Sequence, residues 1–249
     1  MTLLIAFPGQ GSQSHSMLTE LSDHDISIKN EYIATLKQNG IDIQEILNSD
    51  PGQINETEIT QPIILAHSLV LFNKYKNRLD GEIILSGHSL GELTAACISM
   101  GLPLDKSIQL AQRRAILMQE SMKANKIKTA TIAVLGDLSD EALSLFTHYD
   151  KVWLINFNSK MQTVITGEES QIQQLSVALK ELSSIRRIVP IAMSVSSHCP
   201  LLLNILTKWR QTIEETFNNY SVSYPVCSNK TTQVHTDKDE IINNLVEQL

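Results

Sequence analysis

The stretch ILSGHSLGELTAA, residues Ile84–Ala96, contains the transition that decides the fold. The run Gly81–Leu85 predicts a short buried strand, and apolar residues recur at helical spacing from Leu90 onward. Ser89 therefore falls at a sharp turn from a strand into a helix. The segment Gly87–Gly91 matches the pattern G-x-S-x-G, which places a serine hydroxyl at such a turn. The pattern fixes only three positions, so Ser89 is either an activated nucleophile or an ordinary serine at a helix start.

A nucleophilic serine needs a base, because its hydroxyl is weakly reactive until a histidine accepts the proton. His198 stands out, because SVSSHCP lies where a returning helix begins. His88 adjoins Ser89 but points elsewhere on a sharp turn, which favours a pocket-lining or supporting role. The histidines that compete for the role of base are His15, His24, His67, His88, His148, His198 and His235.

Composition limits the classes of partner. The chain has 249 residues and is 42% hydrophobic, which suffices for one large domain or a domain with a smaller insert. Its formal charge is −7, and it has no run of lysine or arginine, which argues against a nucleic-acid-binding protein. We therefore expect small molecules or proteins as partners.

Neither membrane nor metal signals stand out. No stretch approaches the roughly 20 apolar residues that span a bilayer, and Met1 leads into LLIAFPGQG without a charged leader, which predicts a cytoplasmic protein without a membrane partner. Cys97, Cys199 and Cys227 are odd in number and lack CxxC spacing, so we expect free thiols and no metal site.

The first half of the chain predicts one strand and then helices. A strand at Leu3–Phe7 is followed by a glycine-containing loop whose backbone amides could face an anion. Residues Ser14–Asp80 are mostly helical in pattern, most clearly over Ile59–Asn77. A second amphipathic helix is expected over Pro103–Met122.

Between Thr129 and Ile191 the pattern changes to strand, helix, strand, strand, helix, strand, the order of a ferredoxin-like βαββαβ unit. We therefore predict an α/β fold with a hydrolase-like parallel-sheet core as the catalytic domain, residues 1–127 and 194–249. A ferredoxin-like subdomain, residues 128–193, is inserted into it. The chain is expected to return as a helix over Ser196–Phe217.

Seven blocks give the sequence a recognisable resemblance. In order they are FPGQGSQ (Phe7–Gln13), TQP (Thr60–Pro62), GHSLGE (Gly87–Glu92), RRAILMQ (Arg113–Gln119), NFNS (Asn156–Ser159), VSSHCPLL (Val195–Leu202) and LVEQL (Leu245–Leu249). With these blocks in register over nearly its whole length, the chain resembles the malonyl-CoA:acyl-carrier-protein transacylases.

The resemblance implies roles for individual residues. Ser89 corresponds to the serine that accepts the acyl group and His198 to the general base. The backbone amides of Gln10 and Leu90 correspond to the oxyanion hole, which suits their glycine-flanked turns. Gln248 corresponds to a glutamine whose carbonyl orients the histidine, giving a Ser-His dyad.

Arg114 corresponds to the arginine that binds a carboxylate, with Gln61 and His88 as further substrate-binding residues, whereas Arg113 is expected in solvent. A guanidinium holds a planar carboxylate through two hydrogen bonds, so Arg114 implies a dicarboxylic acyl group, most simply malonyl. Methylmalonyl is not separated from malonyl by any motif.

The implied activity is transfer of malonyl from coenzyme A to the phosphopantetheine thiol of an acyl carrier protein in fatty-acid biosynthesis, without a cofactor. The alternatives are a freestanding acyltransferase of a polyketide pathway, an acyl hydrolase and an inactive binding subunit. A basic surface for the acidic carrier is open between a docking role and ordinary solvated charges, and its residues are Lys160, Lys180, Arg186 and Arg187.

The chain departs from the family at its end. Family members usually continue with a PVxW segment and a late strand ending in a GPG turn, and this C-terminal segment is absent after Leu249. If that segment covers one side of the sheet, the hold of Gln248 on His198 is weakened, because a terminus frays easily.

Overall fold

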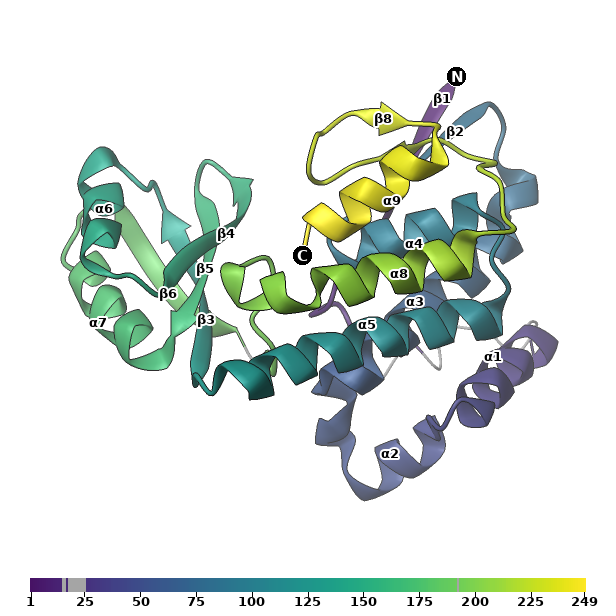
Figure 1. Ribbon diagram of the computed structural model, residues 1–249, viewed down its shortest axis with the longest axis horizontal. Helices are drawn as coiled ribbons and strands as arrows, with labels where there is room; N and C mark the ends of the chain where they lie inside the picture. The colour runs from purple at the N-terminus through teal and green to yellow at the C-terminus, as the bar shows by residue number, and fades with distance from the viewer. Residues whose placement is uncertain (15–16, 18–25, 192) are drawn as a thin grey trace. The chain divides into compact units, whose positions relative to one another are not determined.

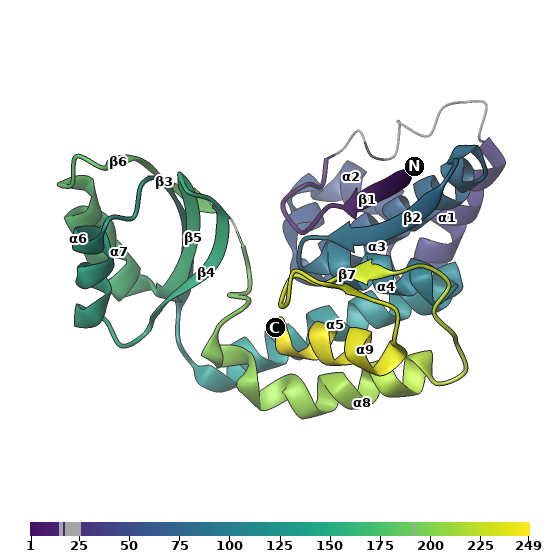
Figure 2. The ribbon, with the colours of Figure 1, turned by 90° about the horizontal axis from the view of Figure 1, so that it is seen from above.

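The computed structural model describes residues 1–14, 17, 26–191 and 193–249. His15, His24 and part of the helical pattern expected over Ser14–Asp80 lie outside these residues. The described chain forms two compact units, the first made of Met1–Leu117 with Leu206–Leu249 and the second of Met118–Ile205. Figure 1 and Figure 2 show the elements of each unit.

The first unit contains a sheet in the order β1-β2-β7-β8. Its strands are β1 (Thr2–Phe7), β2 (Glu82–Gly87), β7 (Val226–Cys227) and β8 (Val234–His235). Strands β1, β2 and β7 run parallel, and β8 pairs antiparallel with β7. The α/β class and the parallel core expected from the sequence are therefore present, with one antiparallel strand at the edge.

Helices supply most of the first unit's buried surface. They are α1 (Ile26–Gln38), α2 (Ile43–Ser49), α3 (Thr57–Tyr75), α4 (Leu90–Ser99), α5 (Leu104–Asn125), α8 (Leu206–Phe217) and α9 (Lys238–Glu247), with 3₁₀ turns η3 (Pro51–Asn55) and η4 (Lys76–Arg78). Tyr32, Leu36, Ile63 and Ile108 belong to a core cluster that joins α1, α3 and α5. Helix α4 packs on β2 and α3, and α8 lies along α9 (Figure 1).

The second unit contains β3 (Thr129–Gly136), α6 (Asp140–Leu145), η5 (Phe146–His148), β4 (Val152–Ser159), β5 (Gln162–Glu168), α7 (Glu169–Lys180) and β6 (Ile185–Ile191), followed by η6 (Pro200–Ile205). The order strand, helix, strand, strand, helix, strand is as expected. Its sheet has the order β4-β5-β3-β6, and every neighbouring pair is antiparallel. Ile132, Ile165, Leu175 and Leu179 lie in its core.

The helix expected over Ser196–Phe217 is wrong for its first half. Helix α8 begins only at Leu206, and residues Pro200–Ile205 form a 3₁₀ turn instead. Pro200 disfavours helical geometry at the residue before it, and His198 has a φ of 58°, which no right-handed helix contains. The apolar spacing of this segment thus concealed a break next to His198.

Gly87 and Gly91 allow three backbones to meet at the end of β2. A Cβ on Gly91 would lie 2.1 Å from the carbonyl oxygen of Phe7, and a Cβ on Gly87 would lie 2.2 Å from the carbonyl carbon of Gly91. Both contacts are with backbone atoms, which cannot rotate away. The two glycines of G-x-S-x-G are therefore required for packing as well as for the turn.

We predict that Gly91→Ala destabilises the chain by about 1–3 kcal/mol or more, because the added carbon overlaps the end of β1. Chemical denaturation of wild type and variant measures the difference. Gly52→Ala is the matched control, since its Cβ would meet only the mobile carboxylate of Asp50. Equal losses in the two variants would contradict the packing argument.

Candidate active site

Ser89 occupies a strained turn between β2 and α4. Its φ is 55° and its ψ is −104°, and it precedes the first residue of the helix. Positive φ is unusual for a residue with a side chain, and such strain clusters at functional sites. The strand-to-helix turn expected for a nucleophile is therefore present, with the serine side chain half-buried.

Arg114 reaches Ser89 from helix α5. The guanidinium is 2% exposed, and its Nη2 donates to Ser89 Oγ at 3.2 Å. Its Nη1 donates to Gln61 Oε1 at 3.0 Å. Its neighbour Arg113 is half-buried and lines an open surface groove instead. The choice of Arg114 over Arg113 thus corresponds to a difference in burial and in contacts.

The contacts of Arg114 continue to the loop after β1. Gln61 Nε2 donates to Gln10 Oε1 at 3.4 Å, and Gln10 Nε2 donates to Thr57 Oγ1 at 3.2 Å. Gln61 is fully buried on α3. The structure therefore joins Ser89, Arg114, Gln61 and Gln10 in one hydrogen-bonded cluster, although they come from four separate segments of the chain.

The two expected oxyanion donors both lie at element ends. Leu90 is the first residue of α4, and the first N–H groups of a helix have no acceptor within the helix. Gln10 follows β1 in a turn that is closed by Ser12, whose Oγ donates to the Gly9 carbonyl at 2.8 Å. His88 is exposed at the elbow, and its backbone N–H donates to the Phe7 carbonyl at 3.3 Å.

Glu92 is a buried carboxylate that sequence reasoning did not single out. It is 1% exposed, and its Oε2 accepts a hydrogen bond from the Asn229 backbone N–H at 3.0 Å. Burial raises the pKa of Glu92, and hydrogen bonds from Asn229 and Ser228, together with the charges of His235 and Arg114, oppose the rise. Glu92 therefore shares an electrostatic environment with Arg114.

Arg114 remains a cation in this environment. Burial lowers the pKa of Arg114 to about 10, and the nearby Glu92 charge acts in the opposite direction. A pKa of about 10 still leaves the guanidinium protonated at neutral pH. Its two hydrogen bonds given above go to neutral oxygens, so the site presents a buried positive charge beside the Ser89 hydroxyl. Such a site favours an anionic group next to the reacting carbon.

His198 belongs to the second unit, whereas Ser89 belongs to the first. It lies in the segment between β6 and η6 and is half-buried. This segment is held within its own unit, because Ser196 Oγ is 2.7 Å from Thr166 Oγ1 and Ser121 Oγ donates to the Leu201 carbonyl at 2.5 Å. The pairing of His198 with Ser89 stays a prediction.

Gln248 follows the last turn of α9 in the first unit. It is 8% exposed, and its backbone N–H donates to the Asn244 carbonyl at 3.0 Å. The role expected for it, orienting His198, stays a prediction because the two residues belong to different units.

Asn229 is a second residue that sequence reasoning missed. Its side-chain Oδ1 accepts a hydrogen bond from the Ser89 backbone N–H at 2.7 Å. A signal was available, because Asn229 follows the buried strand Val226–Cys227, and polar residues at the carboxyl ends of parallel strands gather at one sheet edge. The 140 residues between the two positions hid this contact.

The cysteines of the chain are free thiols. Burial raises the pKa of Cys97 to about 12 and that of Cys199 to about 11, which disfavours thiolate chemistry at neutral pH. Among the described residues, no cluster of three histidine, cysteine or acidic side chains could hold a metal ion. No helix in the described part of the chain is long and apolar enough to cross a membrane.

Comparison with known proteins decides the family. Residues 5–245 match the acyl transferase domain. The chain belongs to this family. A malonyl CoA-acyl carrier protein transacylase of Staphylococcus aureus is 31% identical over 257 aligned positions, which cover 98% of this chain and 79% of the relative. The resemblance found in the sequence blocks is thereby confirmed.

Solved acyltransferase structures have the same fold. The malonyl-CoA:acyl carrier protein transacylase of Helicobacter pylori matches with a TM-score of 0.87 and 30% identity, covering 100% of this chain and 79% of the other. A malonyl-transacylase named PlMCAT, solved with the type II polyketide acyl-carrier protein AntF, matches with a TM-score of 0.85 and 27% identity, covering 99% and 80%. The α/β architecture of this acyltransferase is thus that of the transacylases.

We predict that Glu92→Gln flattens the dependence of stability on pH. The native state holds the Glu92 proton more tightly than the unfolded state, where its pKa is near 4.5. As pH rises from 4.5 through the raised pKa, the native state therefore binds more protons, and the free energy of unfolding falls. The glutamine cannot ionise, so this decrease should disappear.

Denaturant unfolding of both proteins at several pH values measures the effect. The variant keeps an oxygen acceptor for the Asn229 N–H, which limits other changes. Glu45→Gln, at an exposed carboxylate, is the control and should leave the profile unchanged. Parallel profiles for wild type and Glu92→Gln would show that Glu92 titrates alike in the native and unfolded states.

Proposed function

We propose that this acyltransferase moves a malonyl group from coenzyme A to the phosphopantetheine thiol of an acyl carrier protein, in fatty-acid biosynthesis. One observation carries the proposal: the buried Arg114 guanidinium donates a hydrogen bond to Ser89 Oγ. An acyl group on that oxygen would bring its far carboxylate to a desolvated cation. An uncharged acyl chain gains nothing from such a cation, whereas malonyl does.

The reaction runs in two halves through a covalent intermediate. Ser89 Oγ attacks the thioester carbonyl carbon of malonyl-CoA while His198 accepts the hydroxyl proton. The tetrahedral oxyanion is held by the backbone N–H groups of Gln10 and Leu90. The carbon–sulfur bond then breaks, His198 returns the proton to the departing thiolate, and a malonyl ester of Ser89 with free coenzyme A results.

The second half reverses these steps with a different thiol. The phosphopantetheine thiol of the carrier protein gives its proton to His198, and its sulfur attacks the carbonyl carbon of the Ser89 ester. The same two N–H groups hold the oxyanion, and Ser89 Oγ leaves with the proton from His198. All atoms are supplied by the two substrates and the side chains, so the proposed reaction uses no cofactor.

The remaining site residues support this chemistry in the proposal. Gln61 fixes one side of the Arg114 guanidinium, which leaves the cation oriented toward Ser89. His88 lines the entrance, in accordance with its exposure at the elbow. Gln248 orients the His198 ring through its backbone carbonyl.

The second unit is proposed to be a ferredoxin-like insertion. Its support is the βαββαβ element order together with the antiparallel strand order β4-β5-β3-β6. The proposal assigns residues 128–193 to the insertion and residues 1–127 with 194–249 to the catalytic domain. A cytoplasmic location belongs to the same proposal.

A polyketide pathway is the alternative to fatty-acid biosynthesis. The likeness to a transacylase solved with a type II polyketide carrier protein favours it. The site chemistry is the same in both, and the identity of the carrier protein that accepts malonyl distinguishes them. Hydrolysis and a binding function without catalysis are separated from transfer by the experiment below.

We predict a malonyl adduct on Ser89 in intact-protein mass spectra after incubation with malonyl-CoA. Ser89→Ala should show none. Arg114→Ala should lose selectivity for malonyl-CoA over acetyl-CoA by about 10- to 100-fold, because a charge-assisted pair contributes about 1.5–3 kcal/mol. Arg113→Ala is the matched control, since this neighbour is only half-buried and lies outside the cluster.

Addition of a holo carrier protein completes the test. Movement of the adduct from Ser89 to the carrier is the expected result. An adduct that is lost to water alone would identify a hydrolase, and a folded wild type without an adduct would identify a binding subunit.

A further inference from the structure

Asn229 contacts the nucleophile turn on both sides of Ser89. Its side-chain Oδ1 accepts from the Ser89 N–H at 2.7 Å, and its Nδ2 donates to the Gly87 carbonyl at 2.5 Å. Its own backbone N–H donates to Glu92 Oε2 at 3.0 Å. One residue therefore binds the peptide groups that flank the strained position and a carboxylate in the first turn of α4.

The strain at Ser89 requires such contacts. A φ of 55° with a ψ of −104° is unfavourable for a serine, and it persists only where the surroundings hold it. The Ser89 N–H points to Asn229 in this conformation, while the next N–H along the chain, that of Leu90, begins the helix. The Asn229 amide thus occupies one N–H of the turn and leaves the Leu90 N–H for the oxyanion.

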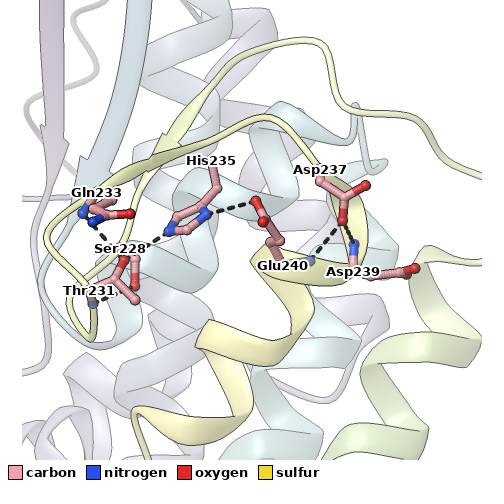
Figure 3. Close-up of polar contacts among 7 residues, drawn as sticks. All are labelled: Ser228, Thr231, Gln233, His235, Asp237, Asp239 and Glu240. Atoms are coloured by element: carbon pink, nitrogen blue, oxygen red, sulfur yellow. Dashed lines mark hydrogen bonds and ion pairs between the residues drawn. The ribbon is translucent and has the colours of Figure 1, made fainter.

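The loop that carries Asn229 is fixed by its own contacts (Figure 3). The Ser228 N–H donates to the Gln233 carbonyl at 3.0 Å, and Ser228 Oγ accepts from the Lys230 N–H at 3.0 Å. His235 is hydrogen-bonded to Thr231 Oγ1 at 2.8 Å and to Glu240 Oε2 at 2.9 Å. These bonds close the hairpin between β7 and β8 and tie it to α9, so Asn229 sits on a rigid support.

We propose that Asn229 is a positioning residue that holds Ser89 in its reactive conformation. This inference rests on Ser89 being the nucleophile of the proposed function. A planar amide suits the role, because it presents an acceptor and a donor side by side for the Ser89 N–H and the Gly87 carbonyl. Asn229 acts through the backbone of the turn and through Glu92, and it does not touch the reacting atoms.

The test separates positioning from substrate binding and from stability. Ser89 reactivity is measured with a small fluorophosphonate, which does not depend on Arg114. The kcat and KM for malonyl transfer and the midpoint of thermal unfolding are measured on the same proteins. The variants are Asn229→Ala and Asn229→Asp, and Lys230→Ala is the matched control, since Lys230 lies in the same loop and forms only an exposed ion pair with Glu247.

For Asn229→Ala we expect fluorophosphonate labelling and kcat to fall about 100-fold, the loss typical of a misplaced reacting group. KM should stay within about twofold, because Arg114 and Gln61 are untouched. Asn229→Asp should retain about a tenth of wild-type labelling, since a carboxylate still accepts from the Ser89 N–H but cannot donate to Gly87. Lys230→Ala should match wild type.

Several outcomes would overturn the inference. A folded Asn229→Ala that labels within twofold of wild type would do so, as would a rise in KM with unchanged kcat. If Asn229→Ala does not fold, Asn229→Asp decides, and wild-type labelling in that variant would overturn it. A wild type that labels but accepts no malonyl would defeat the proposed function alone, whereas a wild type that does not label defeats this inference.

Discussion

The site depends on the close approach of three backbones where β1, β2 and α4 meet. Gly87 and Gly91 admit this approach because a side chain at either would overlap backbone atoms. The chain must then reverse between them within a few residues, and Ser89 takes up the required positive φ. Its hydroxyl is presented at the carboxyl end of the sheet, where ligands of parallel α/β sheets bind. Packing and reactivity therefore have one cause.

A buried charge pair sets the electrostatics around this turn. Arg114 is 2% exposed and Glu92 is 1% exposed, and burying either ion alone would be costly. They oppose each other's pKa shifts, but no direct ion pair is formed among the hydrogen bonds given for the described residues. Glu92 binds the Asn229 N–H, while Arg114 binds neutral oxygens. The cation is thereby stabilised at a distance and keeps capacity for an anionic substrate.

The sequence was informative where a pattern is local. The strand before Ser89, the helix after it and the βαββαβ order could be predicted, because each is encoded by the spacing of apolar residues. The helix expected over Ser196–Phe217 failed at its start, since amphipathic spacing does not register a positive φ at His198. The strand Val226–Cys227 was also missed, because two residues carry no periodicity.

Long-range contacts explain the rest. Arg114, Gln61 and Gln10 were found through resemblance, and no spacing in the sequence shows that their side chains meet in one cluster. Glu92 was visible within GHSLGE, but its burial follows from tertiary packing. Asn229 has neither charge nor motif to mark it. Its contact with Ser89 exists only after β7 pairs with β2 at Leu85 and Val226, which brings the hairpin beside the turn.

The short strand β7 thus has an importance beyond its two residues. It places an amide on the Ser89 N–H and a backbone N–H on Glu92, so the same hairpin bears on the nucleophile and on the charge balance of Arg114. A change that shifts the hairpin would alter both the direction of the hydroxyl and the environment of the cation. The reactivity of Ser89 and the preference for an anionic acyl group are therefore coupled through one loop, which no pairwise description of serine and arginine would reveal.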